Sequence, residues 1–76
     1  MDNKAYIIKL KVYEDNEFYE DMTIQMVFAT HEDAEESLIK NGYKYVDDKL
    51  TIELKHETGI TKAVADISEV QIAIKN

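Results

Sequence analysis

Carboxylates are the side chains of this sequence whose number and spacing most clearly suggest chemistry. Residues 12–39 contain no lysine, yet nine of the chain's sixteen Asp and Glu residues fall within them. A surface of one charge sign steers a partner of the opposite sign. The sequence therefore predicts an acidic face, provided that residues 14–21 and 32–36 lie at the same end of the fold. The alternative is that these acids only solvate the surface.

Aromatic residues lie within the first run of acids. Phe18 and Tyr19 stand between acidic residues, and Tyr13 precedes them. Aromatic side chains anchor many protein interfaces, and a ring rimmed by carboxylates suits lysine and arginine side chains. We therefore predict a set of residues that bind a protein partner with a basic surface. Its members are Glu14, Asp15, Glu17, Phe18, Tyr19, Glu20, Asp21, Glu32, Asp33, Glu35 and Glu36.

The same carboxylates do not match a known metal or catalytic site. An EF-hand calcium loop needs acids at alternating positions and a glycine at the sixth, and residues 14–21 contain no glycine. His31 and His56 are far apart in the sequence, and no nucleophile is paired with a base. The chain contains no cysteine, which excludes a thiolate zinc site and a disulfide framework. We predict no metal, no cofactor and no enzymatic activity.

Composition excludes further classes of function. All nine basic residues are lysines and the formal net charge is −7, so the chain repels the backbone of nucleic acids. The longest apolar run, residues 26–29, is far shorter than a membrane-spanning helix. The N-terminus does not show the basic and apolar regions of a secretion signal. We expect a cytoplasmic protein that binds neither nucleic acid nor membrane directly.

Apolar residues at every second position predict the strands that position these side chains. The first half of the chain has this pattern at residues 5–13 and 22–29, with a polar turn at residues 14–17, and reads as an antiparallel hairpin. The second half predicts strands at residues 43–46 and 50–55, with turns at residues 47–48 and 57–59. Residues 60–75 fit a helix as well as a strand; we favour a strand with a bulge or bend at Ser68 and Glu69.

A single helix is expected between the two halves. Thr30 is a suitable N-cap, acids follow it in the first turn, and Gly42 tolerates the left-handed conformation that ends a helix, which predicts a helix over residues 31–41. The fold class is therefore α+β: one domain of residues 1–76, strand-strand-helix-strand-strand-strand, with the helix on one face of a small, mostly antiparallel sheet. The predicted core consists of Ile8, Leu10, Ile24, Met26, Phe28, Leu38, Ile52 and Leu54.

Three segments carry a resemblance to a known group of proteins. Residues 28–38 enter the helix, Gly42 and Tyr43 leave it, and residues 65–70 stand near the end of the chain. Together they resemble small acidic proteins encoded by phages and prophages of low-GC Gram-positive bacteria. The resemblance implies a small accessory protein of the bacterial cytoplasm that acts against a host or rival system. It implies no catalytic residues.

These observations predict a non-enzymatic module that presents an acidic face to a basic site on a partner protein. In its sharpest form it mimics the charge of a nucleic-acid backbone and inhibits a host or defence enzyme. The alternative is a structural or assembly module that binds a partner, or a second copy, through sheet edges. Because a domain this small has a limited core, a homodimer is possible, with residues 70–74 as the candidate edge strand.

Overall fold

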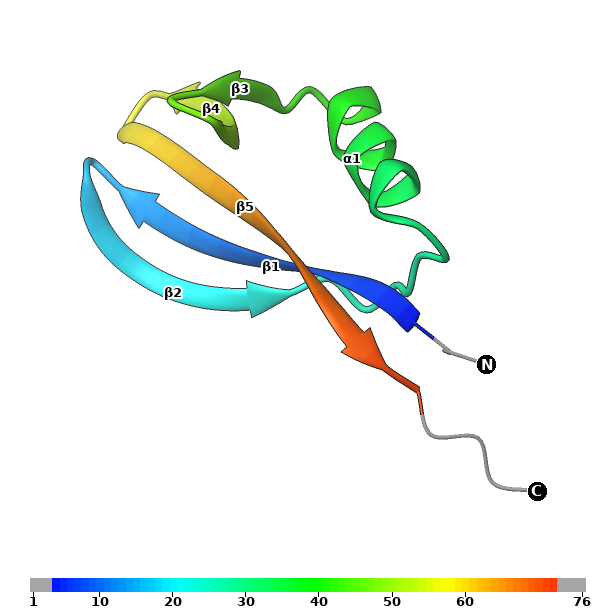
Figure 1. Ribbon diagram of the computed structural model, residues 1–76. Helices are drawn as coiled ribbons and strands as arrows, with labels where there is room; N and C mark the ends of the chain where they lie inside the picture. The colour runs from blue at the N-terminus through cyan, green and yellow to red at the C-terminus, as the bar shows by residue number, and fades with distance from the viewer. Residues whose placement is uncertain (1–3, 73–76) are drawn as a thin grey trace.

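The computed structural model of the protein describes residues 4–72, which form an antiparallel sheet of five strands and one helix (Figure 1). The predicted α+β class is confirmed. The elements in chain order are β1 (Lys4–Glu14), β2 (Glu17–Thr23), α1 (His31–Lys40), β3 (Lys44–Val46), β4 (Lys49–His56) and β5 (Gly59–Gln71). In the sheet the strands lie side by side in the order β2-β1-β5-β4-β3.

Two-residue turns close the first two hairpins. Asp15 and Asn16 join β1 to β2 with φ angles of 49° and 68°, and Asp47 and Asp48 join β3 to β4 with φ angles of 50° and 65°. Positive φ at both positions is the conformation of a type I′ turn, whose twist matches the flanking strands and which Asp and Asn tolerate well. The turns predicted at these residues are confirmed.

The second strand begins earlier than the sequence pattern predicts. It was expected at residues 22–29, but β2 is Glu17–Thr23, because a two-residue turn brings Glu17 directly opposite Glu14. The chain leaves the ladder after Thr23, and only Phe28 rejoins it, by an isolated bridge to Tyr6. The alternation that suggested a strand here arises because Ile24 and Phe28 both pack against the core.

The helix matches the prediction closely. The Thr30 side chain accepts a hydrogen bond from the Asp33 amide at 3.0 Å, and Gly42 follows the helix with a φ of 97°. Of the helical residues, Ala34 and Leu38 are buried. Their spacing of four residues places them on the same side of α1, and both belong to the core.

The ambiguous last segment is a strand up to Gln71, and the helical alternative is wrong there; its residues 73–75, and with them the end of the candidate edge strand at residues 70–74, lie outside the described residues. β5 pairs with β1 in one continuous register, from Lys4 opposite Gln71 to Glu14 opposite Thr61, so the bulge expected at Ser68 and Glu69 is absent. The irregularity lies instead between β1 and β2 at Val12 and Tyr13, where β2 has an extra residue. Both faces of β5 carry apolar residues, which accounts for the apparent change of phase.

The core differs from the prediction at three residues, because Met26, Ile52 and Leu54 do not belong to the buried cluster. Ile8, Leu10 and Leu38 are buried as expected, and Ile24 and Phe28 pack against them. Met26 and Leu54, however, are exposed by 54% and 56%. Met26 lies outside the ladder after β2, and Leu54 lies toward the end of β4. The full cluster is Ile8, Leu10, Ala34, Leu38, Leu50 and Ala65, with Ile24, Phe28, Tyr43 and Ile67 packed against it.

Candidate interaction surface

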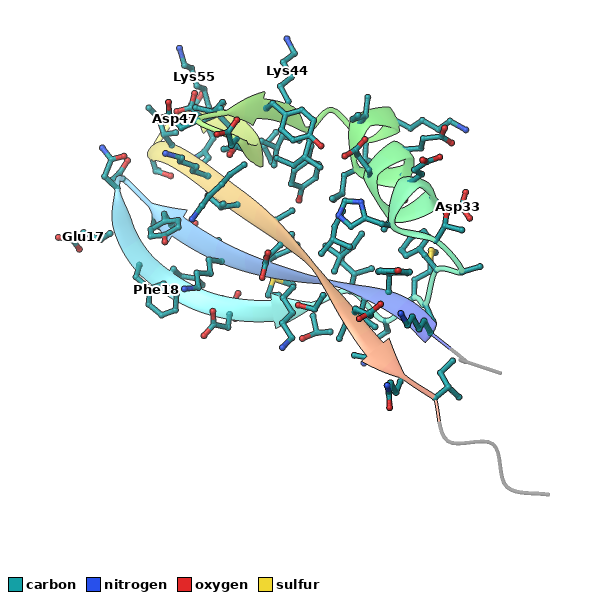
Figure 2. The ribbon with its side chains drawn as sticks, viewed as in Figure 1. Glu17, Phe18, Asp33, Lys44, Asp47 and Lys55 are labelled. Atoms are coloured by element: carbon teal, nitrogen blue, oxygen red, sulfur yellow. The ribbon has the colours of Figure 1, made fainter. Side chains whose placement is uncertain are left out.

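The structure separates the predicted acidic residues into two groups. The start of α1 lies beside the first part of β1, as shown by the 6.0 Å between the ring centroids of His31 and Tyr6. The hairpin turn follows Glu14, eight residues further along β1, which is roughly 26 Å for an extended strand. Glu17 and Asp33 accordingly appear at opposite ends of the molecule in Figure 2. The condition for a single acidic face is not met.

Two acids of the hairpin group hold the fold together. The Glu14 carboxylate accepts a hydrogen bond from the Thr61 hydroxyl at 3.0 Å, and the Asp15 carboxylate accepts one from the Ile60 amide at 2.9 Å. Asp15 also lies against Gly59, where a Cβ atom would come within 2.5 Å of its Oδ1. These contacts join the β1–β2 turn to the β4–β5 turn. The role of Glu14 and Asp15 is therefore structural in this structure.

The other three acids of the hairpin are exposed on β2. Within residues 4–72, Glu17, Glu20 and Asp21 form no side-chain hydrogen bond or ion pair. Between them, Phe18 is 57% exposed and Tyr19 is 64% exposed. We call these five residues, 17–21, the β2 surface.

The position of β2 in the sheet explains its exposure. It is an edge strand that pairs only with β1, and all of its residues are exposed. The irregularity leaves Tyr19 as the extra residue between Phe18, opposite Tyr13, and Glu20, opposite Val12. Phe18 contacts Tyr13 edge-on, with 6.0 Å between ring centroids. The β2 surface thus combines unpaired backbone groups with two aromatic rings and three carboxylates.

The acids at residues 32–36 are accounted for by interactions within α1 and with the strand that follows it. Glu32 and Asp33 lie in the first turn of α1, where negative charge is favourable. Glu35 accepts a hydrogen bond from the Tyr45 hydroxyl. This hydrogen bond, with smaller contributions from desolvation and from the charge of Glu35, raises the pKa of Tyr45. Glu36 is exposed on the same helix.

His56 lies in a hydrogen-bond network that the sequence did not predict. Its Nδ1 is 3.0 Å from the Thr58 hydroxyl, and its Nε2 is 2.9 Å from the Thr61 hydroxyl. Because Thr61 donates its proton to Glu14, Nε2 of His56 is the donor to the Thr61 hydroxyl. The ring is exposed and lines neither pocket described for residues 4–72. The network ties the hairpin turns together at this end of the sheet.

Within residues 4–72, no group of three or more His, Asp or Glu side chains is arranged so that it could hold a metal ion. No helix in this part of the chain has the length and apolar character needed to cross a bilayer.

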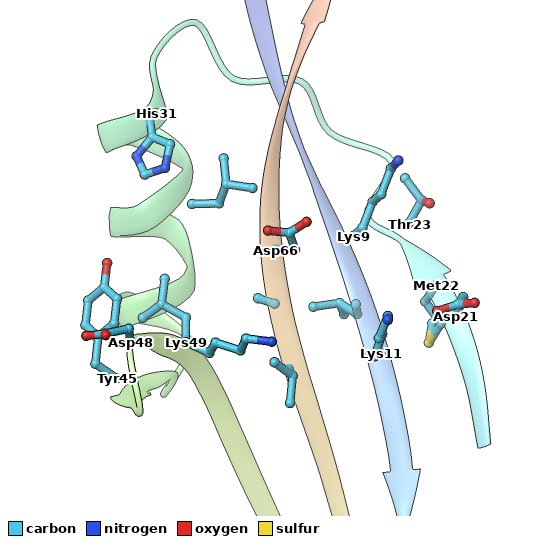
Figure 3. Close-up of a pocket in the computed structure, with 15 residues that line it drawn as sticks. Lys9, Lys11, Asp21, Met22, Thr23, His31, Tyr45, Asp48, Lys49 and Asp66 are labelled. Atoms are coloured by element: carbon cyan, nitrogen blue, oxygen red, sulfur yellow. The ribbon is translucent and has the colours of Figure 1, made fainter. Parts of the chain in front are cut away.

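A pocket of about 720 Å³ lies on the side of the sheet that α1 covers (Figure 3). A row of cross-strand partners lines it, running through all five strands: Met22, Leu10, Ala65, Leu50 and Tyr45. His31 of the helix lines the pocket as well. Sequence reasoning missed this pocket, because it depends on the strand order, which alternation alone does not determine.

The chain matches no protein-family model, no curated protein and no solved structure.

Proposed function

We propose that the protein is a non-enzymatic interaction module that docks through the β2 surface onto a basic site of a partner protein. The observation that supports this most is the exposure of β2 along its whole length, with two aromatic rings held between three carboxylates. Following its resemblance to phage and prophage proteins, the module acts in the bacterial cytoplasm as a phage-encoded accessory protein.

Each component of the β2 surface has a distinct physical role in this proposal. The unpaired backbone of an edge strand recruits a partner strand or polar side chains. Phe18 and Tyr19 bury their rings at the centre of the contact and stack on lysine or arginine side chains. Glu17, Glu20 and Asp21 accelerate encounter with a basic surface. The acids of α1 begin beside the first part of β1, toward the other end of that strand from the hairpin turn.

Mimicry of a nucleic-acid backbone is the narrower form of this proposal. It requires carboxylates spread over a long, continuous surface, whereas two of the five hairpin acids, Glu14 and Asp15, have structural partners. The geometry favours docking by the β2 surface over charge mimicry by all nine acids. If mimicry operates, the protein displaces DNA or RNA from its partner, and the β2 acids are needed for displacement.

Affinity capture with matched variants tests the proposal. One variant replaces Glu17, Glu20 and Asp21 with Gln, Gln and Asn, and the control replaces Glu32, Asp33 and Glu36 in the same way. Both variants lose the same charge, so they separate a local contact from a general effect of net charge. We expect the β2 variant and the double variant Phe18→Ala/Tyr19→Ala to lose the captured protein, and the helix variant to retain it. Equal loss in both charge variants would contradict docking through β2.

Association of two copies through their β2 edges is the weaker candidate. In the symmetric antiparallel register centred on Glu20, this residue would face its own copy, and Tyr19 would face Asp21. Like charges directly opposite each other in a sheet are destabilising. The sequence of β2 therefore favours a different, basic partner over a second copy in this register.

A further inference from the structure

The second half of β5 is paired on one side only. The ladder between β4 and β5 ends where Leu50 faces Ala65, whereas the ladder between β1 and β5 continues to Gln71. Within residues 4–72, residues 66–71 of β5 therefore have no strand on the side of β4. In Figure 1 this part of β5 extends well past the β3–β4 hairpin. We call this side of residues 66–71 the free edge.

The hydrogen bonds of β1 show which backbone groups face the free edge. Tyr6 exchanges both of its backbone hydrogen bonds with Phe28, and the Ile8 carbonyl accepts from Ile24, so even-numbered residues here point away from β5. Odd-numbered residues of β1 then bond to their β5 partners, Asp66, Ser68 and Val70. By the same alternation, the amide and carbonyl groups of Ile67, Glu69 and Gln71 face the free edge.

The pocket described above adjoins this edge. Asp66 and Ile67, the first residues of the free edge, line it together with Leu50 and Ala65. In Figure 3, α1 lies on one side of β5 while β1 and β2 lie on the other, and His31 and Tyr45 are on the side of the helix. Donors and acceptors aligned along a strand therefore stand next to a partly apolar groove of about 720 Å³. Strand addition uses this combination, in which the backbone provides affinity and a neighbouring pocket provides side-chain selectivity.

We infer that the free edge of β5 and the adjoining pocket bind an extended peptide that carries both apolar and basic residues and adds a strand beside Ile67, Glu69 and Gln71. Ile67 lies on the face of α1 and requires an apolar residue opposite it. Asp66 is an exposed acid and favours lysine or arginine opposite it, whereas the exposed Glu69 carboxylate already has the Lys4 ammonium 3.6 Å away. The net charge of −7 attracts such a peptide from a distance. The free edge itself is separate from the β2 surface, and of residues 17–21 the adjoining pocket includes Asp21.

A synthetic peptide with the sequence of residues 4–12 is a suitable probe. Its residues 8–12 alternate apolar residues with lysine, and in the protein it already pairs with β5 from the other side, with Ile8 opposite Ile67 and Lys9 opposite Asp66. Titrated into the ¹⁵N-labelled protein, it should shift the amide signals of Ile67, Glu69 and Gln71 and slow their hydrogen exchange. The amides of Asp66, Ser68 and Val70 should be protected before and after addition. A peptide with glutamate in place of the lysines that correspond to Lys9 and Lys11 should bind at least tenfold more weakly.

Two variants at one position separate the backbone from the side chain. Glu69→Pro removes an amide that faces the free edge and leaves the hydrogen bonds to β1 in place, so it should stay folded and weaken peptide binding by tenfold or more. Glu69→Gln removes only the charge and should bind within a few-fold of the original protein.

Several results would overturn the inference. These are the absence of binding, equal binding by Glu69→Pro, or signal changes confined to β2. Protection of Ile67, Glu69 and Gln71 that rises with protein concentration without peptide would assign the edge to a second copy instead. If Glu69→Pro does not fold, hydrogen exchange in the original protein without peptide still tests the inference. Slow exchange of the Ile67, Glu69 and Gln71 amides would show that the free edge is already covered. None of these results depends on whether the β2 surface binds a partner.

Discussion

At the scale of single residues, stability depends on a few fully buried side chains. Leu38 is 2% exposed and packs into the cluster formed by β1, β4 and β5, whereas its neighbour Ile39 is 49% exposed on the same helix. The adjacent positions have similar helical surroundings but opposite burial. Substitutions at these two positions therefore measure how much of the stability comes from the contact between the helix and the sheet.

Replacing Leu38 by Ala should lower the free energy of unfolding by about 2–5 kcal/mol, because it removes a buried side chain and leaves a cavity. Ile39→Ala should change it by no more than about 0.5 kcal/mol. Chemical denaturation compares the two variants directly. An unchanged midpoint for Leu38→Ala would show that α1 does not face the sheet.

Two tyrosines that follow α1, Tyr43 and Tyr45, have raised pKa values and should make stability depend on alkaline pH. Burial raises the pKa of Tyr43, and the hydrogen bond to Glu35 is the main cause of the raised pKa of Tyr45. A hydroxyl that holds its proton more tightly when folded stabilises the fold fully below its unfolded pKa, about 10, and loses this contribution as pH rises through the folded pKa. We therefore expect stability to fall above about pH 10. In Tyr45→Phe the fall should be smaller; an identical pH profile would show that the bond to Glu35 contributes nothing.

At the scale of elements, the capped helix was the most predictable part of the chain. The Thr30 hydroxyl satisfies an otherwise unpaired amide of the first turn. Thr30→Ala should therefore cost about 1 kcal/mol, whereas Thr30→Ser keeps the acceptor and should cost much less. Thermal unfolding followed by circular dichroism measures both. Equal losses would mean that the methyl group, and not the hydrogen bond, stabilises the start of the helix.

Local signals predicted the helix and the positions of the turns at residues 14–17 and 47–48, because Thr30, Gly42 and the paired Asp and Asn residues act within a few positions. Tertiary contacts decided the rest. Residues 24–28 alternate like a strand, yet only Phe28 bridges to β1, while the acidic residues of β2 form a strand because the turn fixes their register. The same distinction between local signals and tertiary contacts applies to the candidate site. The exposed β2 residues could be named from the sequence, but the separation of the two acidic groups and the free edge of β5 depend on strand order.

At the scale of the whole molecule, one helix covers a sheet that exposes several large apolar side chains. Leu54 and Ile60 are exposed near the β4–β5 turn, away from the free edge of β5, and Val46 is exposed on β3 beside the β3–β4 turn. We predict self-association at micromolar concentration through these side chains, because small cores commonly gain stability by association. Sedimentation velocity over a range of concentrations measures it, and Leu54→Ser should weaken it. A strict monomer at all concentrations would contradict this prediction.

The central claim, that the β2 surface docks onto a basic partner, is tested most directly by the association rate at several salt concentrations. Exposed charges are screened beyond about 8 Å at physiological ionic strength, so steering by Glu17, Glu20 and Asp21 weakens as salt rises. With the captured partner immobilised, we predict that the rate for the original protein falls steeply with salt. The β2 charge variant should associate slowly at every salt concentration, and the variant of Glu32, Asp33 and Glu36 should behave like the original protein. The same salt dependence in the original protein and the β2 variant would contradict the claim.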